Sequence, residues 1–301
     1  MTVLSVSSIS KSFGSVVALD DVSFDIKKNE ITGFLGPNGA GKSTTIGIIM
    51  QYIFPDRGDV QIFGESASLN IAQLKSRIGL IPATDLPTMK GIKLLKHTGK
   101  LHGLRGQKLQ ESIEEVTNIV GGKSFLSRST KTYSTGQKQR LKIANALIHS
   151  PELIIADEPT AGLDPISRRT LLNLFSKLRA EGKAIFFSNH IISEVENIAD
   201  KVILLNKGKV TLQGNLQEIL STLPVANSYQ LRVDGYTVEN YLSLPGIISA
   251  ESQSNGRTKV LTDGEYGQNP EFLGELIREN QTIQYFSKDY IQLEELMERE
   301  V

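Results

Sequence analysis

The sequence predicts an α/β protein built on a largely parallel sheet, followed by a smaller α+β domain. Over residues 1–222, short apolar runs of strand length alternate with helical sequence, which is the pattern of helices packed on a parallel sheet. After Leu223 and Pro224 the pattern changes to short strands and helices in the order β-α-β-β-α-β. We therefore expect two domains, comprising residues 1–222 and 223–301.

Apolar runs too short to be helices predict the main sheet of the first domain. They span residues 31–35, 78–81, 153–156, 184–187 and 202–205. Helices are expected between them, over residues 42–52, 137–149, 165–181 and 191–199. Residues 3–28 are expected to form antiparallel strands beside the main sheet. Between about 86 and 149 helical sequence replaces the strands, which predicts a helical subdomain inserted into the sheet.

The second domain is predicted to be a ferredoxin-like unit. Its expected strands and helices, in chain order, cover residues 229–233, 238–244, 247–252, 258–261, 270–279 and 283–286. Asn255 and Gly256 join the two middle strands and form a typical type I′ hairpin sequence. An amphipathic helix is expected to follow over residues 291–300.

The overall composition excludes several classes of protein. Lys and Arg together number 33, as do Asp and Glu, so the charge balance does not indicate a nucleic-acid partner. The chain has no cysteine, which excludes disulfides, thiolate metal sites and a cysteine nucleophile. The N-terminus lacks the pattern of a signal peptide, and no apolar run approaches the roughly 20 residues that span a bilayer. We expect a cytosolic protein.

A phosphate-binding loop is predicted between the strand at 31–35 and the helix at 42–52. The run fits G-x-x-x-x-G-K-[ST] and reads Gly36-Pro37-Asn38-Gly39-Ala40-Gly41-Lys42-Ser43. Its glycines let backbone N–H groups turn toward phosphate oxygens, and the helix that follows directs its positive dipole end at them. Lys42 is expected at the β- and γ-phosphates, Ser43 at Mg²⁺, and Thr44 at a further phosphate oxygen. A chance glycine-rich turn is the alternative, and the flanking strand and helix argue against it.

Two acids end the apolar strand at 153–156. In enzymes with this phosphate loop, an aspartate at such a strand end holds Mg²⁺, which assigns that role to Asp157. Glu158, the next residue, is then placed to polarise an attacking water. The alternative is an ordinary surface pair of acids at the end of a strand.

A further run, Tyr133-Ser134-Thr135-Gly136-Gln137, precedes Lys-Gln-Arg and a helix. A serine that opens a helix is commonly just an N-cap. The spacing to Asp157 and the following Glu-Pro-Thr-Ala-Gly-Leu-Asp sequence nevertheless resemble those of the ABC ATPases, in which Ser134, Gly136 and Gln137 match the signature motif. Tyr133 and Thr135 stand where the family usually has Leu and Gly, a variation familiar in the exporter branch whose ATPase is a separate chain.

Further positions match the same family. Asp164 falls at the D-loop position, His190 in Ser-Asn-His at the switch histidine, and Phe13 in Ser-Phe-Gly at the aromatic that stacks on adenine. The alternatives are a structural histidine and a core aromatic residue. The motifs follow one another in the family's order over residues 11–190.

The resemblance implies a P-loop NTPase core of the RecA-like type, with the antiparallel β subdomain and the helical insert. It implies ATP and Mg²⁺ as cofactors, and Glu158, His190 and Lys42 as catalytic residues. Two ATP-binding subunits are expected to pair head to tail, so that Ser134 and Gly136 of one copy face the γ-phosphate held by the other.

The resemblance also implies a function. The chain is expected to bind and hydrolyse ATP and so to power an ABC transporter, in export, through a separate transmembrane permease. Its expected location is cytoplasmic, peripheral on the inner face of the cell membrane. The alternative is a soluble ABC-type ATPase that serves assembly or regulation without transport.

Two features depart from or add to the family pattern. Where most ABC ATPases have a glutamine after the strand at 78–81, this chain has Ala83, which can neither ligate a metal nor donate a hydrogen bond. Thr84 or Asp85 could replace it, and otherwise slow hydrolysis is expected. Residues 90–108 carry several Lys and Arg but no acid, which indicates either a solvated helix face or a surface toward the permease or anionic headgroups.

Overall fold

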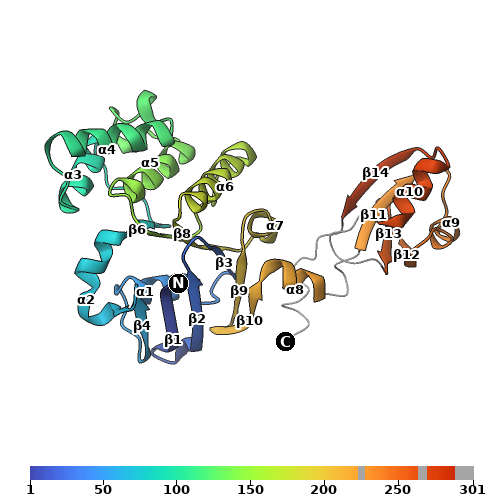
Figure 1. The fold of residues 1–301 in the computed structure, drawn as a ribbon, viewed down its shortest axis with the longest axis horizontal. Helices are drawn as coiled ribbons and strands as arrows, with labels where there is room; N and C mark the ends of the chain where they lie inside the picture. Colours follow the sequence, from blue (N-terminus) through green and yellow to red (C-terminus); the bar gives the residue numbers. More distant parts are fainter. Residues whose placement is uncertain (223–227, 264–269, 289–301) are drawn as a thin grey trace. The chain divides into compact units, whose positions relative to one another are not determined.

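The computed structural model describes residues 1–222, 228–263 and 270–288, and it divides into two compact units (Figure 1). The first unit comprises Met1–Gly214 and the second Asn215–Val301. The division therefore falls before the expected boundary, because helix α8 (Leu216–Thr222) groups with the second unit. Within the described residues, no helix is both long enough and apolar enough to cross a membrane.

The main sheet of the first unit has the strand order β10-β9-β3-β8-β7-β6. Its strands are β3 (Ile31–Leu35), β6 (Ile78–Ile81), β7 (Leu153–Ala156), β8 (Ala184–Asn189), β9 (Lys201–Asn206) and β10 (Lys209–Asn215). The pairs β3/β8, β3/β9, β6/β7 and β7/β8 are parallel, which confirms the sheet predicted from the apolar runs. Because parallel strands end at the same edge, the residues after β3, β7 and β8 lie together there.

A second sheet packs beside the first, with strand order β2-β1-β4-β5. Its strands are β1 (Thr2–Phe13), β2 (Val16–Lys27), β4 (Arg57–Ile62) and β5 (Glu65–Ser66). The rings of Phe24, Phe34 and Phe186 join the two sheets, with centroids 5.2–5.6 Å apart. The sequence did not indicate β4, since only Val60 and Ile62 of this strand are buried.

The helical subdomain lies on the other side of the main sheet (Figure 1). It contains α3 (Gly91–Leu101), α4 (Gly106–Ile119) and α5 (Thr135–Leu147). Ser134 and Gln137 form a capping box at the start of α5, and each side chain accepts a hydrogen bond from the other residue's backbone N–H. Tyr133, which departs from the family pattern, is buried and donates a hydrogen bond to the Phe125 carbonyl at 2.8 Å. This tyrosine therefore anchors the subdomain.

Helices of the first unit outside that subdomain are α1 (Lys42–Ile49), α2 (Ala67–Leu74), α6 (Pro165–Ala180) and α7 (Ile192–Glu196). Asp164 caps α6, because its carboxylate accepts hydrogen bonds from the backbone N–H groups of Ile166 and Ser167. Proline at the first position of α6 costs no hydrogen bond, since that N–H has no partner within the helix.

After α8, the elements of the second unit follow the order β-α-β-β-α-β, and its sheet has the strand order β12-β13-β11-β14 with antiparallel neighbours. The elements are β11 (Ser228–Val233), α9 (Val238–Leu242), β12 (Ile247–Ser252), β13 (Thr258–Thr262), α10 (Glu271–Arg278) and β14 (Ile283–Lys288). Tyr229, Leu231, Tyr241 and Phe272 are among its buried core residues. The helix expected at 291–300 lies outside the described residues.

Candidate nucleotide and catalytic site

The phosphate loop connects β3 to α1 at the edge of the main sheet. Gly41 has φ of 109°, a conformation that glycine adopts without strain. A Cβ atom at Gly36 would collide with the backbone carbonyl of Leu205, so only glycine allows β9 to lie this close. Pro37, Asn38 and Gly39 are exposed, which leaves the loop accessible from solvent.

Lys42 is the buried cation of this loop. Its ammonium group donates hydrogen bonds to the carbonyls of Gly36 at 2.7 Å and Pro37 at 3.0 Å. Burial lowers the pKa of Lys42, and the nearby carboxylates of Glu158 and Asp157 oppose this shift. The Lys42 ammonium group is therefore held by carbonyl groups of its own loop. Ser43 and Thr44, which follow at the start of α1, are exposed and half-buried respectively.

The two acids after β7 are positioned by Ser188 on the neighbouring strand. The Ser188 hydroxyl donates a hydrogen bond to Asp157 Oδ1 at 2.7 Å and accepts one from the Glu158 N–H at 2.8 Å. Glu158 has φ of 45°, a left-handed conformation that is costly for a residue with a side chain. Ser188 therefore links the two acids to β8 at the end of the sheet.

Glu158 is the centre of the catalytic cluster predicted from the sequence. Its Oε1 lies 3.7 Å from Lys42 Nζ and 3.7 Å from His190 Nδ1. The three residues come from the phosphate loop, the end of β7 and the end of β8. The fold thus gathers a cation, a carboxylate and an imidazole at one edge of the sheet, the arrangement needed to bind phosphate and to activate water.

A hydrogen-bonded network of Asn189, Glu194 and Arg168 holds the backbone at His190. Asn189 Oδ1 accepts hydrogen bonds from the backbone N–H groups of His190 at 2.8 Å and Ile191 at 3.0 Å. Asn189 Nδ2 donates to the buried carboxylate of Glu194 at 2.7 Å. Glu194 also accepts from Arg168 on α6 at 3.2 Å. The segment at His190 is therefore linked to α6, the helix that follows Asp164.

The signature residues lie at the start of α5, on a different element from the catalytic cluster. Ser134 is exposed, and Gly136 and Gln137 are half-buried. Gln137 Oε1 also accepts a hydrogen bond from Arg128 at 3.0 Å. These residues present a helix N-terminus at the surface, where a second molecule can approach it.

Asp164 and Phe13, the residues matched to the D-loop and to the adenine-stacking position, are both exposed. Asp164 accepts a hydrogen bond from the Ser167 hydroxyl at 2.6 Å, and its hydrogen bonds lower the pKa of its carboxyl group. Phe13, at the end of β1, is 51% exposed, with Lys11 Nζ 5.6 Å from its ring centroid. An aromatic residue this exposed is not a core residue, which removes the alternative role considered for Phe13.

The loop after β6 contains Ala83 in place of the usual glutamine. Lys142, a buried residue of α5, donates hydrogen bonds to the carbonyls of Pro82 at 3.0 Å and Ala83 at 3.2 Å. Asp85 forms an exposed ion pair with Lys138 at 3.3 Å. Two lysines of the signature helix thus hold this loop, and Asp85 is engaged away from the catalytic cluster.

The protein groups present are compatible with Mg²⁺. No cluster of three or more His, Cys, Asp or Glu side chains suited to a metal occurs in the part of the chain that the structure describes. Mg²⁺ at phosphate sites needs only one or two protein oxygens, because phosphate and water supply the rest. The hydroxyl of Ser43 and the carboxylate of Asp157 are such oxygens.

Sequence reasoning missed Ser188, Asn189, Glu194, Arg168 and Lys142. Ser188 and Asn189 directly precede His190 at the end of a strand, a position that could have drawn attention to them. Nothing in the spacing of Glu194, Arg168 and Lys142 along the chain indicates their contacts, because their partners belong to other elements.

Comparison with known proteins gives consistent results. A family model described as ABC transporter matches residues 19–161. The linearmycin resistance ATP-binding protein LnrL of Bacillus subtilis is 34% identical over 234 residues, covering 77% of this chain and 75% of LnrL. The bacitracin transport ATP-binding protein BcrA of Bacillus licheniformis is 37% identical over 214 residues, covering 69% and 68%. The uncharacterised ABC transporter ATP-binding protein YxlF of B. subtilis is 32% identical and covers 97% of each chain.

Solved structures agree with the sequence comparisons. The ATP-binding subunit of an ABC transporter is 29% identical, covers 72% of this chain and 91% of its own, and superposes with a TM-score of 0.67. The structural similarity to this subunit and the motifs at the edge of the sheet indicate the same family as the sequence similarity to LnrL and BcrA. The chain belongs to the ABC transporter family, as one of its ATP-binding, ATP-hydrolysing subunits.

Proposed function

We propose that Glu158 activates the water that attacks the γ-phosphate of ATP, with Lys42 and His190 as its catalytic partners. The observation that carries this proposal is the 3.7 Å approach of Glu158 Oε1 to both residues. Lys42 neutralises charge on the β- and γ-phosphates. In this proposal His190, whose backbone N–H donates to Asn189, contacts the γ-phosphate beside the attacking water.

We assign the remaining nucleotide contacts as follows. Backbone N–H groups of residues 36–41 and the side chain of Thr44 bind phosphate, while Phe13 stacks on adenine. Ser43 and Asp157 hold Mg²⁺, which supplies positive charge to the phosphates. Ser188 orients Asp157 for this role through its 2.7 Å hydrogen bond.

Two copies of the chain pair head to tail in this proposal. Ser134, Gly136 and Gln137 of one copy then cap the ATP bound by the other, and Asp164 lies in the same interface. The exposed N-terminus of α5 supports this, because its N–H groups and dipole favour an anion from outside the subunit.

We propose that the pair drives a separate transmembrane permease in export, from the cytoplasmic face of the cell membrane. LnrL and BcrA, whose names refer to resistance and to bacitracin transport, support this direction. On α3, Lys93, Lys96 and Lys100 are exposed and suit contact with a permease at the membrane surface.

We further propose that residues 223–301 are an accessory domain that acts on pairing or on coupling to the permease. Its core is its own, built around Tyr229, Tyr241 and Phe272. YxlF, which is similar over 97% of both chains, has a counterpart of this region. Deleting residues 223–301 should preserve ATP binding and change the lifetime of the ATP-bound dimer. Loss of ATP binding in a soluble truncated protein would contradict an accessory role.

The variant Glu158→Gln tests the proposed chemistry. It should bind ATP with near-normal affinity, lose turnover by roughly 10²-fold or more, and accumulate as an ATP-bound dimer in light scattering. Lys42→Ala is the matched control, since it should weaken nucleotide binding itself. Turnover of Glu158→Gln near the normal rate would exclude Glu158 as the base.

The role in transport needs a separate experiment. Isolation of the chain from detergent-solubilised native membranes should bring a polytopic permease with it. Recovery without any membrane subunit, combined with normal ATP-driven pairing, would instead favour a soluble ATPase that serves assembly or regulation.

A further inference from the structure

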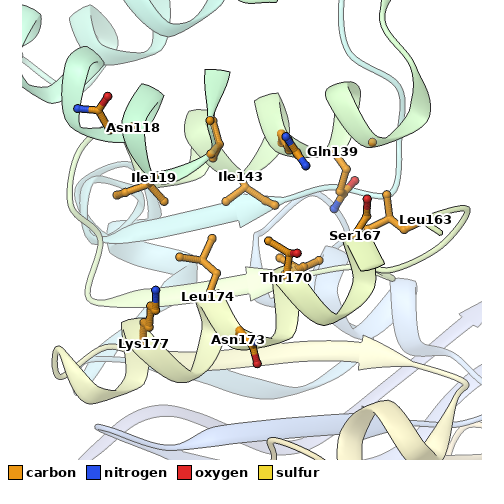
Figure 2. A pocket seen from close by; sticks show the side chains of 15 residues that line it. Asn118, Ile119, Gln139, Ile143, Leu163, Ser167, Thr170, Asn173, Leu174 and Lys177 are labelled. Atoms are coloured by element: carbon orange, nitrogen blue, oxygen red, sulfur yellow. The ribbon is translucent and has the colours of Figure 1, made fainter. Parts of the chain in front are cut away.

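A pocket separates the signature helix α5 from α6, which follows the D-loop (Figure 2). Its volume of about 470 Å³ lies within the range of small-molecule sites, roughly 300–1,000 Å³. The α5 residues that line it recur at helical spacing, as do those of α6, so that one face of each helix is turned to the other. Gly136, Gly121 and Ser167 are too small to fill the space between these faces.

The two ends of this α5–α6 pocket differ chemically. Figure 2 shows Asn118, Ile119 and Lys177 at one end and Gln139 and Ser167 at the other. Ser167 and Lys177 are ten positions apart on α6, which separates the ends by about 15 Å. Ile143, Leu171 and Leu174 line the pocket, and Ile143 and Leu174 lie between its ends (Figure 2). A molecule that fits is therefore elongated, with an apolar middle.

The end near α4 favours an anion. Lys177 is exposed there and forms no ion pair with any residue that the structure describes. The Arg140 guanidinium lies close to Gly121, since its Nη1 is 3.8 Å from the position of a Cβ on that glycine. None of the 15 lining residues is an aspartate or glutamate. A carboxylate at this end would be attracted to Lys177, and no acid lines the pocket to oppose it.

The other end offers a buried hydrogen-bond donor. Gln139 is 9% exposed, and its Nε2 is buried without a hydrogen-bond partner. A buried unpaired amide costs free energy that an acceptor on a bound molecule would recover. Figure 2 shows the Gln139 side chain extending from α5 toward α6, which places that donor at the end of the pocket.

We propose that the α5–α6 pocket binds an elongated amphiphilic carboxylate that carries an oxygen acceptor at its far end. The carboxylate lies at Lys177, the apolar chain covers Ile143 and Leu174, and the far oxygen accepts from Gln139 Nε2. A medium-chain ω-hydroxy acid has these features and the required length.

The position of the pocket connects it to ATP-driven pairing. Gly136 lines it, and Ser167, another lining residue, donates the 2.6 Å hydrogen bond to Asp164. A molecule held by α5 and α6 together stabilises one orientation of the signature helix relative to the D-loop. This regulatory consequence rests on the proposed function, whereas binding itself does not.

The test uses the full chain without nucleotide, with the isoleucine δ1 methyl groups labelled for NMR. The probe is 10-hydroxydecanoate, compared with decanoate, which lacks the far oxygen, and with 1,10-decanediol, which lacks the charge. We expect Ile119 and Ile143 to shift while Ile62, in the other sheet, does not. The probe should bind about tenfold more tightly than either comparison compound.

Two variants separate the two ends of the pocket. In Gln139→Leu, 10-hydroxydecanoate should bind no better than decanoate, and in Lys177→Gln its advantage over the diol should largely vanish. Lys96→Gln, on the exposed face of α3, is the matched control and should bind as the unaltered chain does. Equal affinity for the three compounds, or shifts confined to other methyl groups, would overturn the proposal. ATP binding measured in parallel keeps this result separate from the test of Glu158.

Discussion

Lys142 Nζ lies 3.2 Å from the Ala83 carbonyl oxygen and donates a hydrogen bond to it. This contact joins the signature helix to the loop after β6, the loop that lacks the family's glutamine. The backbone N–H of Asp157 in turn donates to the carbonyl of Ile81, the last residue of β6, at 2.9 Å, so the start of this loop lies beside the two acids that follow β7. A lysine therefore connects the helical subdomain to the edge of the sheet where Asp157 and Glu158 lie.

Lys142→Met should lower ATP turnover several-fold and leave ATP affinity within about twofold. The substitution keeps the length of the side chain but leaves the carbonyls of Pro82 and Ala83 without their buried donor. Steady-state phosphate release and a fluorescent-nucleotide titration measure the two quantities. Lys138→Met is the control, because its exposed ion pair with Asp85 contributes little. An equal loss in both variants would mean that the Lys142 contact has no special role.

Ala83→Gln should raise basal turnover or make it depend on lower Mg²⁺ concentrations. The glutamine would restore a polar group beside the metal and water, where alanine offers none. A Mg²⁺ titration of ATPase activity measures both effects. Ala83→Leu, of similar bulk but without the amide, should show neither effect. If Ala83→Gln leaves turnover and Mg²⁺ dependence unchanged, the missing amide does not limit the reaction.

Glu194→Gln should reduce turnover and lower the free energy of unfolding by about 1 to 3 kcal/mol. The variant removes the charge that pairs with Arg168 and weakens the acceptor for Asn189, which orients the His190 loop. Denaturant titration and phosphate release give the two measurements. Glu115→Gln, at an exposed position of α4, is the control and should change neither quantity. Unchanged turnover despite reduced stability would show that the network serves the fold alone.

The free energy of unfolding should fall as pH decreases from about 6.5 to 4 because of His149. Burial, followed by the neighbouring His102, lowers the pKa of His149 from 6.5 to about 4. In that window the unfolded chain binds a proton that the folded chain does not, so acid favours unfolding, and the stability is fully present above pH 6.5. The effect should be on the order of 1 to 2 kcal/mol, after allowance for the partial exposure of the ring.

Denaturant titrations at several pH values measure this dependence. His149→Gln keeps a donor for the Ile78 carbonyl, which His149 Nε2 contacts at 3.0 Å, but cannot take up a proton. Its stability should therefore depend less on pH over the same window. An identical pH profile in this variant would assign the acid sensitivity to other groups.

The motifs and the parallel sheet could be predicted from the sequence because they depend on local patterns. The run Gly36–Ser43 must form a loop between a strand and a helix, and buried strands such as Leu153–Ala156 are recognisable as short apolar runs. Asp157, Glu158 and His190 each follow such a strand, and parallel strands end at one edge. Their meeting was therefore predictable, although the 3.7 Å distances were not.

Other features were decided only by the tertiary structure. Strand β4 pairs with β1 through backbone hydrogen bonds, and its alternation of buried and exposed residues is too weak to identify it. Lys142 and Glu194 acquire their roles from partners on other elements, and the α5–α6 pocket exists because small residues of two helices face each other. Local sequence determines which motifs are present, whereas packing between distant segments determines what each side chain contacts.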